Sequence, residues 1–389
     1  MLKDIGSFVV RTSARCLSSL CVSHSGEPKR RAVGELAHGI ELGMGGYCSL
    51  SRVDENPSET SFLLNLRTYS DLAIVLQGQI DGCLNFLLET IAFYRNAYPD
   101  SKIIVSTWNT ESNSSIEVLK RCDDCDVVLS EPPTDPGNLN VNLQTVNSLA
   151  GIRYAKSKGA KFICKTRTDQ RLQRHDFLGT LIDYINRFPP ADGLPCKGRV
   201  AALAMTYGNL FYPFLLSDFL YLGYSEDMEQ VFSLPLDDRP LFDMPVGSTR
   251  REWSEAELAP EVRISKFYAR SLGLASESSV KAYWSFLRDA VVCSDMQSAG
   301  LIWPKYPTRF LYEESQGLAF PNDDSEKLMT YNTDFHTWFS LYSGAIRYRR
   351  SFERFADVVF KSLAYNNEKK LIIIPGWILA ILYSFQVQY

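Results

Sequence analysis

The sequence has no excess of basic residues. Its 389 residues include 41 Lys and Arg against 45 Asp and Glu, which gives a formal net charge of −4. Proteins that follow a nucleic-acid phosphate backbone normally carry a basic excess, so we expect no nucleic-acid partner. Histidine is also scarce. The four histidines show no metal-ligand spacing and are interpreted as surface or core residues.

Cysteine is present but forms no disulfide framework. The nine cysteines are scattered and odd in number, which is typical of a reducing compartment and predicts a cytoplasmic location. Cys122 and Cys125 are the one close pair. They lack the second pair of a zinc site and the surroundings of a thioredoxin-like site. We interpret them as two semi-buried thiols beside the start of a strand.

The sequence also lacks an uninterrupted apolar run of about 20 residues, the length that a membrane-spanning helix needs. The nearest candidate is Leu371–Phe385, 15 nearly apolar residues that Pro375 and Gly376 interrupt. Two interpretations stay open for this segment. It is either a buried terminal element or a peripheral contact with the inner face of the plasma membrane. No secretory signal is expected at the N-terminus.

Hydrophobic residues make up 45% of the chain, and from residue 71 onward their spacing alternates between strand and helix. Short apolar runs predict strands buried on both faces. The predicted strands begin at Leu72, Lys102, Asp126 and Phe162, and the predicted helices cover about 82–98, 115–121 and 143–157. This alternation predicts an α/β fold with a largely parallel sheet, in which ligands bind at the carboxyl ends of the strands.

The first two strands end in candidate donor-binding residues. Gln77 and Gly78 follow the first strand, where glycine lets backbone amides approach a ligand and the next helix offers its positive end to a phosphate. A plain strand-to-helix turn is the alternative. Trp108 ends the second strand, where its ring either stacks on a base or sugar or forms part of the core.

Amide side chains follow the third strand. Asn138, Asn140, Asn142 and Gln144 occupy every second position, so an extended segment points them the same way. Amides suit sugar hydroxyls because each offers donors and an acceptor. The alternative is an Asn-rich turn and helix cap.

The fourth strand ends in charged residues. Lys165, Arg167, Asp169 and Arg171 place three cations and one carboxylate within seven residues. If the strand continues through them, alternation puts all four on one side, where the cations suit a diphosphate and Asp169 suits a divalent metal or a sugar hydroxyl. A structural cluster of ion pairs is the alternative.

These strand ends together resemble the WavE family of lipopolysaccharide core synthesis proteins. The segments that carry the resemblance are Ile74–Gln79, Ser106–Glu111, Gly137–Gln144 and Lys165–Arg171. The resemblance implies a glycosyltransferase with a GT-A-like, nucleotide-sugar-binding sheet flanked by helices and a mostly helical C-terminal part. We accordingly divide the chain into an N-terminal extension (1–70), a GT-A-like domain (71–270) and a C-terminal helical part with an apolar tail (271–389).

The resemblance also bears on whether the enzyme needs a divalent metal to bind the donor diphosphate. In the GT-A fold an Asp-x-Asp motif near the end of a central strand usually binds Mg²⁺ or Mn²⁺ and the donor diphosphate, whereas this sequence reads Arg167-Thr168-Asp169. Two expectations follow. Either Asp169 holds the metal, or the enzyme works without one and Lys165, Arg167 or Arg171 neutralises the leaving diphosphate.

The expected reaction is transfer of a sugar from a nucleotide-sugar donor to a growing lipopolysaccharide or other surface glycan, including a lipid-linked one. A base commonly takes the proton of the acceptor hydroxyl. We favour Asp218 as that base because apolar and aromatic neighbours surround it in the sequence and burial can raise the pKa of a carboxylate. A helix cap is the alternative for Asp218. The other candidate bases are Glu226, Asp227, Asp237 and Asp238.

Two other functions stay open. One is a phosphate-ester hydrolase or nucleotidyltransferase that uses the same basic residues. The other is a non-catalytic glycan-binding or assembly subunit of a surface-polysaccharide pathway, which would bind glycan but no nucleotide.

Overall fold

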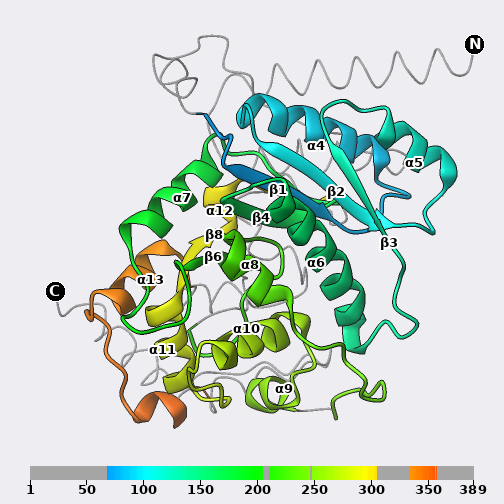
Figure 1. The fold of residues 1–389 in the computed structure, drawn as a ribbon. Coiled ribbons are helices and arrows are strands. Elements are labelled where there is room, and N and C mark those ends of the chain that lie inside the picture. Colours follow the sequence, from blue (N-terminus) through cyan, green and yellow to red (C-terminus); the bar gives the residue numbers. More distant parts are fainter. Residues whose placement is uncertain (1–67, 205–209, 246–247, 305–332, 355, 357–389) are drawn as a thin grey trace, which may run out of the picture.

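The computed structural model describes residues 68–204, 210–245, 248–304, 333–354 and 356 (Figure 1). Most of the predicted N-terminal extension and the whole apolar segment Leu371–Phe385 lie outside the described residues, so the two interpretations of that segment stay predictions. Among the helices of the described part, none is long and apolar enough to cross a membrane.

A seven-stranded sheet forms the centre of the fold, with the order β3-β2-β1-β4-β7-β6-β8. Strand β7 is antiparallel to both of its neighbours, and all other pairings are parallel. The strands are β1 Leu72–Gln77, β2 Lys102–Trp108, β3 Asp126–Ser130, β4 Phe162–Arg167, β6 Val200–Ala204, β7 Tyr221–Tyr224 and β8 Val291–Asp295. The predicted α/β class with a largely parallel sheet is confirmed.

Helices cover both faces of the sheet. Helices α4 and α5 connect strands that follow one another in one direction across the sheet, whereas α6 connects β3 to β4 in the opposite direction. Because such connections are right-handed, α6 lies on the face opposite α4 and α5 (Figure 1). The helices of this half are α4 Leu84–Ala97, α5 Asn113–Lys120, α6 Val141–Ser157, α7 Phe177–Arg187 and α8 Ser225–Phe232.

Helix α6 packs close to β1 and β2 at Gly151, which has no side chain. A Cβ at this position would lie 2.5 Å from Val75 Cγ1 and 2.9 Å from Ser106 Cβ. The hydroxyl of Ser106 donates to the carbonyl oxygen of Asn147 at 2.7 Å. This contact fixes α6 over β1 and β2, and with it the first turn of α6, which carries several of the predicted site residues.

Two helices, α9 Arg250–Ala256 and α10 Pro260–Ser271, come before or reach the predicted boundary at residue 270. Beyond it, the described residues of the predicted C-terminal part form α11 Val280–Ala290, α12 Met296–Ala299 and α13 Phe335–Tyr342. Strand β8 also comes from this part, so the sheet draws strands from both sides of residue 270. The domain boundary placed there stays a prediction.

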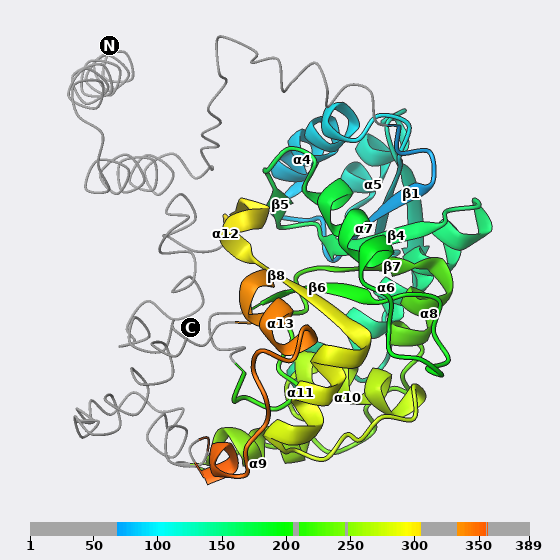
Figure 2. The same cartoon turned by 90° about the vertical axis from the view of Figure 1, so that its left-hand side faces the viewer.

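A segment of the C-terminal part lies beside the residues that follow β4. After β8 and α12, strand β9 Leu301–Ile302 pairs antiparallel with β5 Arg171–Leu172. Figure 2 shows β8 and α12 running along the molecule toward β5 and α4. The residues directly after β9 therefore lie beside the residues that follow β4.

Candidate active site

Asp218 lies between β6 and β7, where Gln144 and Lys165 both contact it. The Nε2 of Gln144 donates to Asp218 Oδ2 at 2.7 Å, and the Nζ of Lys165 donates to the backbone carbonyl oxygen of Asp218 at 2.6 Å. The segment that carries Asp218 leads into β7 rather than into a helix, so Asp218 is not a helix cap. One contact holds the carboxylate and the other holds the backbone.

Lys165 is completely buried in β4. Burial lowers the pKa of its ammonium group to about 8, although the nearby charge of Asp218 opposes that shift. A lysine with no exposed surface cannot meet a substrate directly without rearrangement. In the structure it positions the segment that carries Asp218.

Arg167 and Asp169 form a two-pronged ion pair at the end of β4. The Nε and Nη2 of Arg167 donate to Asp169 Oδ1 at 2.8 Å and Oδ2 at 3.0 Å. Arg167 Nη1 lies 3.9 Å from Asp218 Oδ2. Burial tends to raise the pKa of Asp169, but the hydrogen bonds and charge of Arg167 outweigh it and leave that pKa below its ordinary value.

Trp303, directly after β9, contacts both members of this ion pair. Its Nε1 donates to Asp169 Oδ2 at 3.0 Å, and its ring centroid lies 5.3 Å from the guanidinium carbon of Arg167. The ring of Phe219 meets Trp303 edge-on at a centroid distance of 4.7 Å. No local sequence pattern links Trp303 to Asp169, because Trp303 comes from the C-terminal part, 134 residues beyond Asp169.

We call this group the Asp218 cluster: Gln144, Lys165, Arg167, Asp169, Asp218 and Trp303. Glu261, in the first turn of α10, lies close to it. Burial and the neighbouring Asp218 carboxylate raise the pKa of Glu261 above its ordinary value. This residue was also missed, since nothing in its local sequence marks it.

The side chain of Arg171 contacts helix α4. Strand β4 ends at Arg167 and a turn follows, so the alternation expected through residue 171 is wrong. Arg171 belongs to β5 instead, where its guanidinium carbon lies 4.8 Å from the ring centroid of Phe86 and its Nη1 lies 3.9 Å from Glu89 Oε2. Both partners belong to α4.

The Asn-rich segment is a short 3₁₀ turn, η1 Asn138–Asn140, followed by α6. The extended conformation expected for it is therefore wrong. Asn142 Nδ2 donates to the carbonyl oxygen of Asp237 at 2.9 Å, and Asn142 Oδ1 accepts from the Asp237 N–H at 2.6 Å. Asn138 Nδ2 donates to Asp237 Oδ2 at 3.0 Å. Both amides are almost fully buried. The turn of the alternative interpretation is present, but neither η1 nor α6 has a side-chain cap hydrogen bond.

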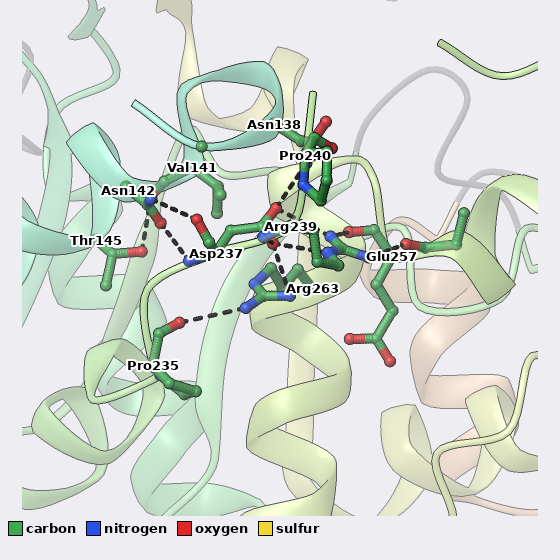
Figure 3. Close-up of polar contacts among 12 residues, drawn as sticks. Asn138, Val141, Asn142, Thr145, Pro235, Asp237, Arg239, Pro240, Glu257 and Arg263 are labelled. Atoms are coloured by element: carbon green, nitrogen blue, oxygen red, sulfur yellow. Dashed lines mark hydrogen bonds and ion pairs between the residues drawn. The ribbon is translucent and has the colours of Figure 1, made fainter. Parts of the chain in front are cut away.

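Figure 3 shows the group to which these amides belong, which we call the Asp237 cluster: Asn138, Asn142, Asp237, Arg239 and Arg263. Arg239 Nε donates to Asp237 Oδ1 at 2.6 Å, and Arg239 also donates to carbonyl oxygens of residues 256 and 257. Burial raises the pKa of Asp237, but hydrogen bonds from Arg239 and Asn138 and the charge of Arg263 outweigh it and hold that pKa well below its ordinary value. The cluster ties the loop after α8 to η1 and α9.

The loop after β1 is held against the turn after β4. The N–H of Thr168 donates to the carbonyl oxygen of Gln77 at 3.1 Å, and its hydroxyl donates to the carbonyl oxygen of Gln79 at 2.7 Å. Gly78 has a φ of +140°, and a Cβ there would lie 2.7 Å from Thr168 Oγ1. Gly78 thus lets the loop after β1 approach the turn after β4 closely.

Trp108, at the end of β2, is buried, which agrees with the alternative that its ring forms part of the core.

No preformed metal site is found in the part of the chain that the structure describes, where no three His, Cys, Asp or Glu side chains gather suitably. The oxygens of Asp169 already accept from Arg167 and Trp303. This donor set does not fit a metal bound through Asp169.

Cys122 and Cys125 are half-buried free thiols just before β3, as predicted, and burial raises the pKa of Cys125 to about 12.

Comparison with known proteins places the chain in a family. It matches the WavE lipopolysaccharide synthesis family over residues 72–371 and belongs to that family. No curated protein matches. Among solved structures, a mannosyltransferase from Pyrobaculum calidifontis in complex with GDP-Man and Mn²⁺ aligns at 10% identity and a TM-score of 0.33, covering 97% of this chain and 96% of that one.

A second solved structure is a mannose-1-phosphate geranyltransferase from Thermus thermophilus. It aligns at 10% identity and a TM-score of 0.27, covering 42% of this chain and 63% of that one. Similarity this remote indicates neither a shared reaction nor a shared site.

Proposed function

We propose that the protein is a glycosyltransferase that moves a sugar from a nucleotide-sugar donor to a hydroxyl of a lipopolysaccharide or other surface glycan. Membership of a lipopolysaccharide synthesis family supports the pathway. The observation that carries the reaction is the Asp218 carboxylate, which Gln144 orients and Arg167 approaches to 3.9 Å at the carboxyl end of β4. Ligands of such sheets bind at this edge.

In the proposed reaction Asp218 is the general base. It accepts the proton of the acceptor hydroxyl while that oxygen bonds to the anomeric carbon of the donor, and the bond from that carbon to the diphosphate breaks. Arg167 stabilises the charge that develops on the departing diphosphate. Gln144 and Lys165 keep Asp218 in place through the side-chain and backbone contacts described above.

The test is product analysis with a panel of nucleotide sugars and purified core oligosaccharide. The proposal expects donor consumption that depends on acceptor and a product heavier by one sugar. Donor cleavage at an equal rate without acceptor would favour the hydrolase. Glycan binding without any nucleotide binding would favour the assembly subunit.

The membrane contact stays part of the proposal. A lipid-linked acceptor lies at a membrane surface, and an apolar segment such as Leu371–Phe385 would bring the enzyme to it. Sedimentation of the full chain with anionic lipid vesicles, compared with a chain ending at residue 370, tests this assignment.

A further inference from the structure

The resemblance to the WavE family implies that Asp169 stands at the end of the position of the Asp-x-Asp motif, yet its carboxylate is engaged within the protein. Arg167 approaches it with two nitrogens at 2.8 and 3.0 Å, and the indole N–H of Trp303 reaches Oδ2 at 3.0 Å. Charge-assisted pairs of this two-pronged kind are among the stronger hydrogen bonds in proteins. They also fix the plane of the guanidinium.

A divalent cation at Asp169 would have to replace these contacts. Mg²⁺ and Mn²⁺ bind through carboxylate oxygens, and the oxygens available here already face the positive charge of Arg167. A cation bound beside that guanidinium would be repelled by it. The described residues supply no group of three suitable ligands that would offset this repulsion.

Arg167 is the cation best placed to meet a diphosphate. Its side chain is 29% exposed, whereas Lys165 is completely buried and donates to the Asp218 carbonyl oxygen. Arg171 packs on α4. The indole of Trp303 lies beside the guanidinium, so Asp169 and Trp303 together hold Arg167 in a defined position next to Asp218.

We propose that Arg167, oriented by Asp169 and Trp303, neutralises the diphosphate of the donor in place of a divalent cation. This inference rests on the proposed function, because it assigns the counter-charge within the same site. Asp169 is then a positioning residue for Arg167, and Trp303 is a second one.

The test is calorimetric titration of the full chain with UDP, GDP and CDP, each in EDTA and again in Mn²⁺. We expect one nucleoside diphosphate to bind with the same affinity in both conditions. Arg167→Met should then weaken its binding about 10- to 100-fold, the range expected for hydrogen bonds to a charged group. The loss should be smaller for the corresponding nucleoside monophosphate, which lacks the second phosphate.

Three further variants sharpen the assignment. Arg167→Lys keeps the charge without the two-pronged geometry and should recover only part of the affinity, and it serves if the Met variant fails to fold. Trp303→Phe keeps an aromatic ring and removes the N–H donor to Asp169. Asp169→Asn should change binding equally in EDTA and in Mn²⁺. Arg153→Met removes an exposed arginine paired with Glu229 on α8 and is the matched control, which should leave affinity unchanged.

The two proposals fail in different ways. Binding that appears only with Mn²⁺ and vanishes in Asp169→Asn overturns the role of Arg167 but leaves the glycosyltransferase intact. Absence of all nucleotide binding by the folded protein in both conditions overturns the glycosyltransferase, and the inference with it.

Discussion

The Asp218 and Asp237 clusters each place at least one amide from α6 or η1 and at least one arginine around a central aspartate, but they differ in how exposed that aspartate is. The Asp218 cluster also contains Lys165, Asp169 and Trp303. The difference lies in the carboxylates, because the side chain of Asp237 is 0% exposed and those of Asp218 and Asp169 are 11% and 27% exposed. The arginines are alike, with Arg239 33% and Arg167 29% exposed. A cluster around a fully enclosed carboxylate holds loops together, while a partly exposed one can also meet a ligand. The predictions below test this difference.

The largest expected effect is loss of catalysis in Asp218→Asn. The amide keeps the size of the side chain but accepts no proton, so we expect kcat to fall by about 10²- to 10⁴-fold. The thermal midpoint should change little. Glycosyl transfer at saturating donor measures the loss, and an active Asp218→Asn variant would remove Asp218 from the mechanism.

The Asp237 cluster should respond in stability instead. Asp237→Ala leaves Arg239 and Arg263 without their buried partner, and breaking such a pair typically costs about 3–5 kcal/mol. Urea unfolding measures the free energy of unfolding. A loss below about 1 kcal/mol, within the range of exposed ion pairs, would contradict the structural role of this cluster.

Two residues on the first turn of α6 offer the most direct comparison. Gln144→Leu removes the hydrogen bond to Asp218, and we expect kcat to fall about 10-fold or more with little change in KM, because hydrogen bonds to charged groups contribute about 1.5–3 kcal/mol. Asn142→Leu removes the bonds to the Asp237 backbone. It should cost about 2–4 kcal/mol of stability and leave kcat per folded molecule unchanged. If both variants lower kcat, or both lower the free energy of unfolding, the distinction between the clusters is wrong.

The smallest effect concerns pH. The pKa of Asp237 is lower in the folded protein than its ordinary value of 3.8. A carboxylate of this kind stabilises the fold above its ordinary pKa, and the contribution is lost as pH falls through the folded pKa. The stability difference between the wild type and Asp237→Asn should therefore be constant near neutrality and shrink below about pH 4. Urea midpoints measured from about pH 7 to about pH 2.5 span the ordinary pKa of an aspartate. They test whether the stability difference shrinks, rather than grows, as the pH falls.

Much of the fold could be predicted because its signals are local. Strands β1 to β4 and helices α4 to α6 appear where apolar runs and helical spacing place them, within two residues at most bounds. The order of the strands in the sheet was harder to predict. Strands β6, β7 and β8 are short and separated by long connections, and pairing between such segments depends on packing that no local pattern records.

What the sequence determined by itself is the set of elements and the charged residues that end them, since hydrophobic periodicity and turn residues act over a few positions. Only the tertiary structure decided which of those residues meet. It brought Gln144 to Asp218 across 74 residues and Trp303 to Asp169 across 134. It also directed Asn138 and Asn142 into a structural cluster. Contacts between distant residues depend on how helices and strands pack, and amide spacing alone cannot distinguish a ligand contact from a loop contact.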